Sequence, residues 1–321
     1  MDSALTVGSH RTGCKREPSK GLQDLNATRP AVALPLEILV AIFLHLQLSI
    51  RGVEWRYGIV PGWVRVTHVC RRWREAAISA AALWTEIQSL GRNWTYIFME
   101  RAKNAPLCIS QDCLYMEETC EMLPTPLDIV NRLSQMRILE LYGPYDVFLP
   151  VINQLHKPAP RLESLAMMME SDNLQAGQIA EAVPGCLLGG DCPSLRKLQL
   201  RDIFFQWNDF CFSNLHTLEL GYIPPEPYQW DRDRRQPTPP ALLAILADIP
   251  NLKSLTLENA MYMPANEAHM RLSTPITLPH LESFELVHRS GRISLVKVYK
   301  PVVRACKVYK HRNVTSGLWG I

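Results

Sequence analysis

Apolar residues near the N-terminus follow helical spacing in two segments. The first set recurs at offsets of one, four, five and eight and shares one helical face: Ile38, Leu39, Ile42, Phe43 and Leu46. The second set recurs at offsets of three, four, seven and eleven: Val66, Val69, Cys70, Trp73 and Ala77. Pro35 suits a first helical turn, where its missing N–H costs nothing. The pattern predicts two amphipathic helices with apolar residues where a partner would pack.

The pattern changes from about residue 130, where a Leu-x-x-Leu-x-Leu phrase returns six times. The copies, some with Met or another apolar residue in place of Leu, span residues 136–141, 162–167, 195–200, 215–220, 252–257 and 281–286. Their first positions are 26, 33, 20, 37 and 29 residues apart, which resembles the period of leucine-rich repeats. Alternating Leu-x-Leu predicts a strand with one buried face, and parallel stacking of successive strands would bury the leucines.

Helices are expected between these strands, over residues 126–136, 149–156, 174–183 and 240–247. They would form the convex side of a solenoid. The predicted fold class is therefore α/β, a small all-α module of three helices followed by an irregular leucine-rich-repeat solenoid with parallel strands. An α/β domain with unrelated βα units is the alternative interpretation. The segment 222–237, rich in proline, aromatic residues and arginine, is either a contact surface or a solvated insertion.

Strand alternation predicts which side chains line the concave face. They are Ile138, Glu140, Tyr142, Ser164, Ala166, Met168, Lys197, Gln199, Arg201, Thr217, Glu219, Gly221, Ser254, Thr256, Glu258, Ser283, Glu285 and Val287. The middle of this face is predicted to be basic, through Lys197 and Arg201, and its C-terminal side acidic.

Two N-terminal segments carry a family resemblance. Leu34-Pro35-Leu36-Glu37-Ile38-Leu39 followed by Ile42-Phe43, and Val69-Cys70-Arg71-Arg72-Trp73-Arg74 followed by Leu83-Trp84, resemble an F-box over about residues 33–87. The sequence of these segments is similar to that of F-box proteins abundant in mushroom-forming fungi. Residues 47–62 form a longer link than many F-boxes have, and we interpret the link as a tolerated loop. The repeats extend the resemblance to F-box proteins with leucine-rich repeats.

The resemblance implies a recognition function without catalysis. An F-box would bind a Skp-type adaptor and, through it, a cullin–RING ubiquitin ligase, while the repeats hold an unknown protein substrate. The residues that match the adaptor-facing pattern are Leu34, Pro35, Ile38, Leu39, Ile42, Phe43, Val69, Cys70, Trp73, Leu83 and Trp84. Some of these could instead pack the F-box helices together, and for Val69, Cys70 and Trp73 this role is at least as well supported. The expected substrate contacts are Tyr142, Met168, Lys197, Gln199, Arg201, Glu219, Thr256, Glu258 and Glu285.

Composition adds little to this interpretation. Hydrophobic residues make up 47% of the 321 residues and charged residues 20%, which is ordinary for a globular protein. The nine cysteines contain no Cys-x-x-Cys pair, which favours reduced thiols and a cytoplasmic or nuclear location. Cys108, Cys113 and Cys120 lack the usual spacing of zinc ligands. No catalytic or nucleotide-binding motif is found, so we expect no enzyme activity and no cofactor. A decayed F-box on a binding scaffold is the alternative function.

The expected organisation has five parts. Residues 1–30 form a disordered segment, 31–90 the F-box, 91–125 a linker, 126–290 the solenoid and 291–321 an atypical basic segment. Eight basic residues and no acidic ones follow Glu285, and the rest of the chain carries a net charge of −5. We expect this tail to be solvated rather than bound to nucleic acid, because no nucleic-acid motif accompanies it. Two β-prone runs, 293–299 and 302–309, are either a cap or the edge of a truncated array. No signal peptide and no membrane segment are expected.

Overall fold

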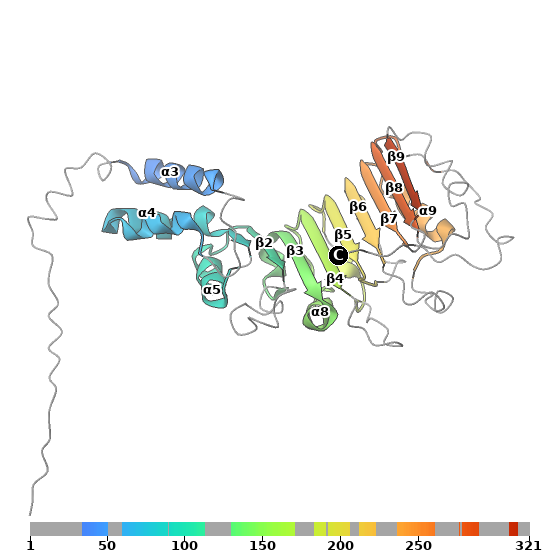
Figure 1. The fold of residues 1–321 in the computed structure, drawn as a ribbon, viewed down its shortest axis with the longest axis horizontal. Coiled ribbons are helices and arrows are strands. Elements are labelled where there is room, and N and C mark those ends of the chain that lie inside the picture. The colour runs from blue at the N-terminus through green and yellow to red at the C-terminus, as the bar shows by residue number, and fades with distance from the viewer. Residues whose placement is uncertain are drawn as a thin grey trace, which may run out of the picture.

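A computed structural model shows an N-terminal group of helices followed by an open sheet (Figure 1). It describes residues 34–50, 60–88, 90–112, 130–170, 183–190, 192–205, 212–222, 236–260, 276, 278–288 and 308–313. Within these residues the fold is mixed α/β, with the helices at the N-terminal end and the strands following in an arc. None of the described helices is long and apolar enough to span a bilayer.

The N-terminal module contains α3 (Leu36–Ser49), the 3-10 helix η1 (Gly62–His68), α4 (Arg71–Ser79) and the 3-10 helix η2 (Ala81–Trp84). The first predicted helix is present and begins directly after Pro35. The second prediction, one helix running through Val66 and Ala77, is wrong. Cys70 adopts an extended conformation (φ −156°, ψ 171°) that separates η1 from α4.

This break has a physical role in the module. The Cys70 carbonyl accepts the first helical bond of α4, from the Arg74 amide at 3.0 Å, while the Arg74 side chain donates back to the Thr67 carbonyl at 2.8 Å. Because the break resets the helical register, Val66 and Ala77 are both buried although Val69 is 60% exposed. The single-helix prediction failed because spacing alone does not show where a helix is interrupted.

The described strands form one parallel sheet of nine strands in the order of the sequence. They are β1 (Glu86–Gln88), β2 (Leu107–Asp112), β3 (Met136–Pro144), β4 (Ser164–Glu170), β5 (Lys197–Arg201), β6 (Thr217–Gly221), β7 (Ser254–Glu258), β8 (Ser283–His288) and β9 (Val308–Asn313). Each of the six repeated phrases supplies one strand, from β3 to β8.

Burial along the strands alternates as the phrase predicts. On β5, Leu198 and Leu200 are buried while Lys197, Gln199 and Arg201 are half-exposed. The strand register places equivalent leucines side by side in neighbouring strands. Leu198 of β5 lies beside Leu218 of β6, which in turn lies beside Leu255 of β7. Burial of each such side chain stabilises the fold by roughly 1.5–3 kcal/mol, so the stacked phrase accounts for the core of the array.

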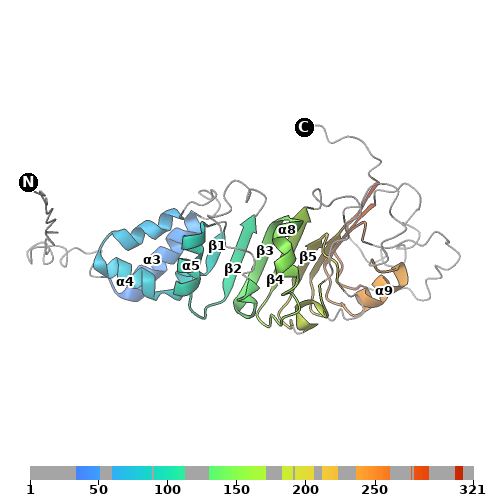
Figure 2. The same cartoon turned by 90° about the horizontal axis from the view of Figure 1, so that it is seen from below.

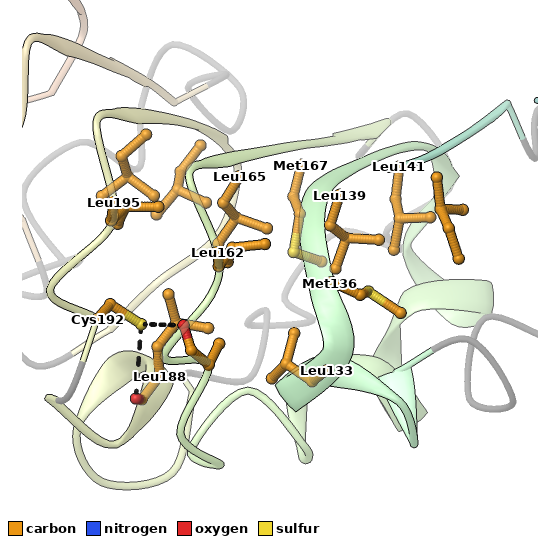
Figure 3. Close-up of a cluster of buried hydrophobic side chains, with 14 of the residues drawn as sticks. Leu133, Met136, Leu139, Leu141, Leu162, Leu165, Met167, Leu188, Cys192 and Leu195 are labelled. Carbon is orange, nitrogen blue, oxygen red and sulfur yellow. Dashed lines mark hydrogen bonds between the residues drawn. The ribbon is translucent and has the colours of Figure 1, made fainter. Parts of the chain in front are cut away.

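The buried side of the sheet is covered by helices and irregular segments. α8 (Tyr145–Ile152) and α9 (Pro239–Ala247) lie on the same side (Figure 2). Beneath the sheet, Leu139, Leu165 and Met167 gather in the core, where the Cys192 thiol donates to the Ala159 carbonyl at 3.3 Å (Figure 3).

The helices predicted between the strands agree with the structure to different degrees. α9 agrees with the prediction for 240–247, whereas α8 begins four residues before the predicted helix at 149 and ends at Ile152. In the described part of 126–136, Val130 is helical, the 3-10 helix η3 covers Leu133–Gln135, and Met136 already belongs to β3. The prediction for 174–183 lies outside the described residues except for Val183, and 222–237 except for its ends. A further 3-10 helix, η4 (Leu187–Gly190), was not predicted.

The sheet begins earlier than the sequence predicts. β1 lies within the predicted F-box, and both α5 (Arg92–Arg101) and β2 lie in the predicted linker 91–125. Ile87 on β1 pairs with Ile109 on β2, so the helical module runs into the sheet without an intervening linker. These elements escaped prediction because β1 is only three residues long and β2 lacks the Leu-x-x-Leu-x-Leu phrase.

At the other end, β9 pairs in parallel with β8 over six residues, from Ser283 beside Val308 to His288 beside Asn313. β9 overlaps the second β-prone run by two residues and continues beyond it. The first run, 293–299, lies outside the described residues, so the choice between a cap and a truncated array stays open.

Candidate protein-binding surfaces

The apolar residues of α3 are divided between two faces. Leu39 and Phe43 are fully buried, and the Phe43 ring packs against Trp73 with centroids 5.1 Å apart. One turn further on, the Gln47 side chain donates to the Leu83 carbonyl at 3.2 Å. This inner face, spaced by four residues, holds α3 to the remaining helices.

The outer face of α3 presents large apolar side chains to solvent. Ile38, Ile42 and Leu46 follow one another at four-residue spacing and are 48%, 45% and 36% exposed. We call this row the α3 ridge. Val69, between η1 and α4, is more exposed still. An exposed apolar row of this kind is typical of a protein–protein contact.

The predicted adaptor residues therefore fall into three groups. Pro35, Ile38, Ile42 and Val69 are exposed, Leu34, Cys70 and Trp73 are half-buried, and Leu39, Phe43, Leu83 and Trp84 are buried. The assignment of the last four to partner contact is corrected, because their side chains are enclosed by their own module. Ile38 and Leu39 were predicted to share one face, but the side chains of consecutive helical residues point about 100° apart.

Beneath the helices lies an aromatic cluster formed by Trp63, Trp84 and Phe98. Trp84 lies 4.9 Å from each of the other two rings, and its indole N–H donates to the Ala77 carbonyl at 2.7 Å. The Arg101 guanidinium sits over the Trp84 ring at 4.3 Å, and burial lowers the pKa of Arg101. The cluster therefore holds η1, η2 and α5 together.

The second surface is the open side of the sheet. Of the 18 residues predicted to face outward, all are half-exposed except Ala166 and Gly221, which are buried. All nine predicted substrate contacts lie on this side, which we call the sheet face. The predicted orientation of the strands is therefore correct, while binding at these residues stays a prediction.

Polar side chains on the sheet face are linked across strands. Arg201 on β5 donates to Glu258 on β7 at 2.9 Å, passing over Gly221 of the intervening strand β6. Gln199 donates to Glu219 at 2.5 Å. Since Glu258 neutralises Arg201, the middle of this face is less basic than the sequence suggested.

These links surround a shallow depression that is open to solvent. It is lined by Met168, Gln199, Leu200, Arg201, Glu219, Leu220, Gly221, Thr256 and Glu258. Six of the nine predicted substrate contacts belong to this lining. The depression therefore combines acidic and basic side chains with the side chain of Met168.

Gly221 gives a testable detail of this arrangement. A Cβ at this position would lie 3.4 Å from Arg201 Nε and 3.7 Å from Glu258 Cβ, so alanine fits but a larger side chain displaces Arg201. We expect Gly221→Val to lower the free energy of unfolding by about 1–2 kcal/mol through overpacking and loss of the ion pair. Gly221→Ala is the matched control and should be nearly neutral. Urea denaturation measures both, and equal stability of the two variants would contradict the proposed need for space.

A row of basic and acidic residues that was not predicted from the sequence lies at the edge where the strands begin. The second position of each phrase supplies it: Arg137, Glu163, Arg196, His216, Lys253 and Glu282. Arg137 approaches Glu163 at 4.0 Å and donates to the Cys108 sulfur at 3.1 Å, a bond that raises the pKa of Arg137. Burial lowers the pKa of His216, and the charges of Lys253 and Arg196 lower it further. Reading the phrase by position would have revealed this row.

Metal binding finds no support in the described part of the chain. Cys108 is buried on β2, while Cys113 and Cys120 lie outside the described residues. Within the described ranges, His, Cys, Asp and Glu side chains form no group of three suited to a metal ion.

Comparison with known proteins identifies the helical end of the chain. Residues 31–88 match the family model of the F-box-like domain. The matched stretch covers α3, η1, α4 and η2 and ends with the last residue of β1. A search of curated proteins finds no similar sequence. The chain therefore carries an F-box-like domain, which confirms that part of the resemblance. The domain match alone suggests a substrate adaptor of SCF type, because F-box domains generally bind Skp-type adaptors.

Proposed function

We propose that this chain is the substrate-receptor subunit of an SCF-type cullin–RING ubiquitin ligase, acting in the cytoplasm or nucleus without a catalytic site of its own. The observation that carries the proposal is the α3 ridge, an exposed apolar row within the stretch that matches the F-box-like family. A Skp-type adaptor would cover this row and connect the chain to a cullin.

The size of the ridge suits this role. Ile38, Ile42 and Leu46 each leave more than a third of the side chain in solvent. Burying a large apolar side chain contributes roughly 1.5–3 kcal/mol, and a few such residues dominate the energy of most interfaces. Val69, between η1 and α4, is a further exposed apolar residue of the matched stretch.

The substrate would bind at the sheet. We propose that the six phrases form a leucine-rich-repeat solenoid and that the sheet face, including the depression near Gly221, is the surface that holds a protein substrate. Parallel strands in sequential order, phrase leucines on the buried side and half-exposed polar residues on the other support this assignment. The substrate surface is thus separate from the α3 ridge.

Capture from cells tests the proposal. The full chain, expressed with an affinity tag in a fungal cell, should retain a Skp-type adaptor together with a cullin, both identified by mass spectrometry. Adaptor without cullin, or neither protein, would contradict the ligase assignment and favour a binding scaffold. A chain that lacks residues 34–50 provides the background for nonspecific capture.

A further inference from the structure

Four basic side chains gather where β5, β6 and β7 begin. They are Arg196, Lys197, His216 and Lys253, and we call them the basic patch. Backbone bonds hold the three strand starts side by side. The His216 amide donates to the Arg196 carbonyl at 2.7 Å, and the Lys253 amide donates to the His216 carbonyl at 2.8 Å. Arg196 and Lys253 are exposed and the other two residues half-exposed, so the patch is open to a partner.

The charges of the basic patch are not neutralised by the described residues. Among these residues, no carboxylate forms an ion pair with any of the four side chains. The Arg196 guanidinium donates to two backbone carbonyls, at 3.0 and 3.2 Å, which position it without removing its charge. Burial lowers the pKa of His216, and the charges of Lys253 and Arg196 lower it further, so these three side chains lie within electrostatic range of one another. At neutral pH the patch thus combines three positive charges with an uncharged imidazole.

Hydroxyl groups continue the basic patch along the sheet face. Strand register places Ser164, Lys197, Thr217, Ser254 and Ser283 side by side from β4 to β8. This row contains no acidic residue, and its side chains are half-exposed. Hydroxyl and ammonium groups both donate hydrogen bonds to anions. The row therefore adds neutral donors to the positive charges.

Acidic residues limit the size of the basic patch. At the strand-entry edge, Glu163 and Glu282 lie one strand to either side of it, and Glu219 follows two residues after Thr217 on β6. The positive charges therefore span only two strand steps, about 10 Å. A nucleic-acid backbone is usually bound along a longer basic stripe. Three single charges within this short span favour a few carboxylates of a polypeptide instead.

We infer that the basic patch binds an extended segment of a protein substrate that carries aspartate or glutamate residues. The inference rests on the proposed function, because it specifies the substrate that the sheet would hold. One carboxylate would lie against Arg196 and another against Lys253, and the hydroxyl row would donate hydrogen bonds to them. An extended chain advances about 3.3 Å per residue, so carboxylates about 10 Å apart are three positions apart in the segment.

Fluorescence anisotropy with the full chain tests this inference. The probe is a rhodamine-labelled peptide, Gly-Glu-Ser-Gly-Glu-Ser-Gly-Glu-Ser-Gly, measured in low salt. We expect it to bind more tightly than peptides with glutamine or lysine in place of glutamate. Rising salt should weaken the binding, because the contacts are exposed ion pairs. Equal or tighter binding of the glutamine or lysine peptide would overturn the inference.

A charge-matched pair of variants locates the site. Lys197→Gln/Lys253→Gln should weaken binding of the glutamate peptide by about fivefold or more, as expected for two exposed ion pairs. Arg65→Gln/Lys103→Gln makes the same charge change on exposed residues outside the basic patch and should leave the affinity nearly unchanged. Equal losses in both variants would show nonspecific attraction and overturn the assigned site. A greater loss for a ten-nucleotide oligothymidylate than for the peptide in the first variant would assign the patch to nucleic acid and also overturn the inference. Circular dichroism melts check that both variants fold.

Adaptor capture separates the two proposals. If the glutamate peptide does not bind while the adaptor and cullin are retained, the inference fails and the proposed function stands. If the peptide binds with the expected variant pattern while no adaptor or cullin is retained, the ligase assignment fails and the basic patch is still a site for acidic peptides.

Discussion

Adaptor capture should fall by at least about 100-fold in the double variant Ile38→Asp/Ile42→Asp, because two apolar contacts worth roughly 1.5–3 kcal/mol each are lost. Both side chains are nearly half exposed and lie on the outer face of α3, so aspartate at these positions stays in solvent in the free chain. In the complex the carboxylates would be buried against apolar groups, which adds a desolvation cost. Biolayer interferometry with purified Skp-type adaptor measures the change.

The control for this variant lies outside the F-box-like stretch. Tyr96 on α5 is 40% exposed, and Tyr96→Asp makes a similar change on a different surface. The control should bind the adaptor as the unaltered chain does, and the thermal melt of the double variant should stay within a few degrees. Undiminished capture by the double variant would refute the ridge as the docking site.

The largest loss of stability is expected from Trp84→Ala. Trp84 is fully buried, contacts Trp63 and Phe98, and donates its indole N–H to the Ala77 carbonyl. Truncating a buried aromatic side chain costs about 3–5 kcal/mol. Here the change also leaves the Ala77 carbonyl without this donor. Urea denaturation followed by circular dichroism measures the loss.

Trp84→Phe refines this test. Phenylalanine refills much of the space but cannot donate to Ala77, so we expect an intermediate loss of about 1–3 kcal/mol. At a temperature where the phenylalanine variant is fully folded, adaptor capture should be unchanged, because the side chain is enclosed. If a fully folded Trp84→Phe chain no longer captures the adaptor, Trp84 contacts the adaptor after all, as the family pattern implied.

The parts of the fold that could be predicted are those where one pattern decides one structure. Each Leu-x-Leu alternation leaves a strand only one way to bury its leucines, and so the six phrase strands and their outward residues were found. β1 and β2 depend instead on neighbouring strands: Glu86–Gln88 has no pattern of its own and is held by pairing with residues 108–110.

The candidate site shows the same division. The family pattern found the right segment of α3, but it could not separate Ile38 and Ile42 from Leu39 and Phe43, because which apolar face is covered depends on where Trp73 and Leu83 lie in the folded module. The charge of the sheet face was misjudged for a related reason. The Arg201–Glu258 pair joins residues 57 positions apart and becomes visible only when Gly221 is seen to lie between them.

β1 ends the F-box-like stretch and is also the first strand of the sheet, so the matched domain and the sheet share this strand. The number of strands then sets the distance between this stretch and the proposed substrate site. β6, at the centre of the depression, stands five strand steps from β1, about 24 Å along the array. A substrate bound there would lie at this distance from the F-box-like stretch. Insertion or deletion of one repeat would change the distance by about 5 Å.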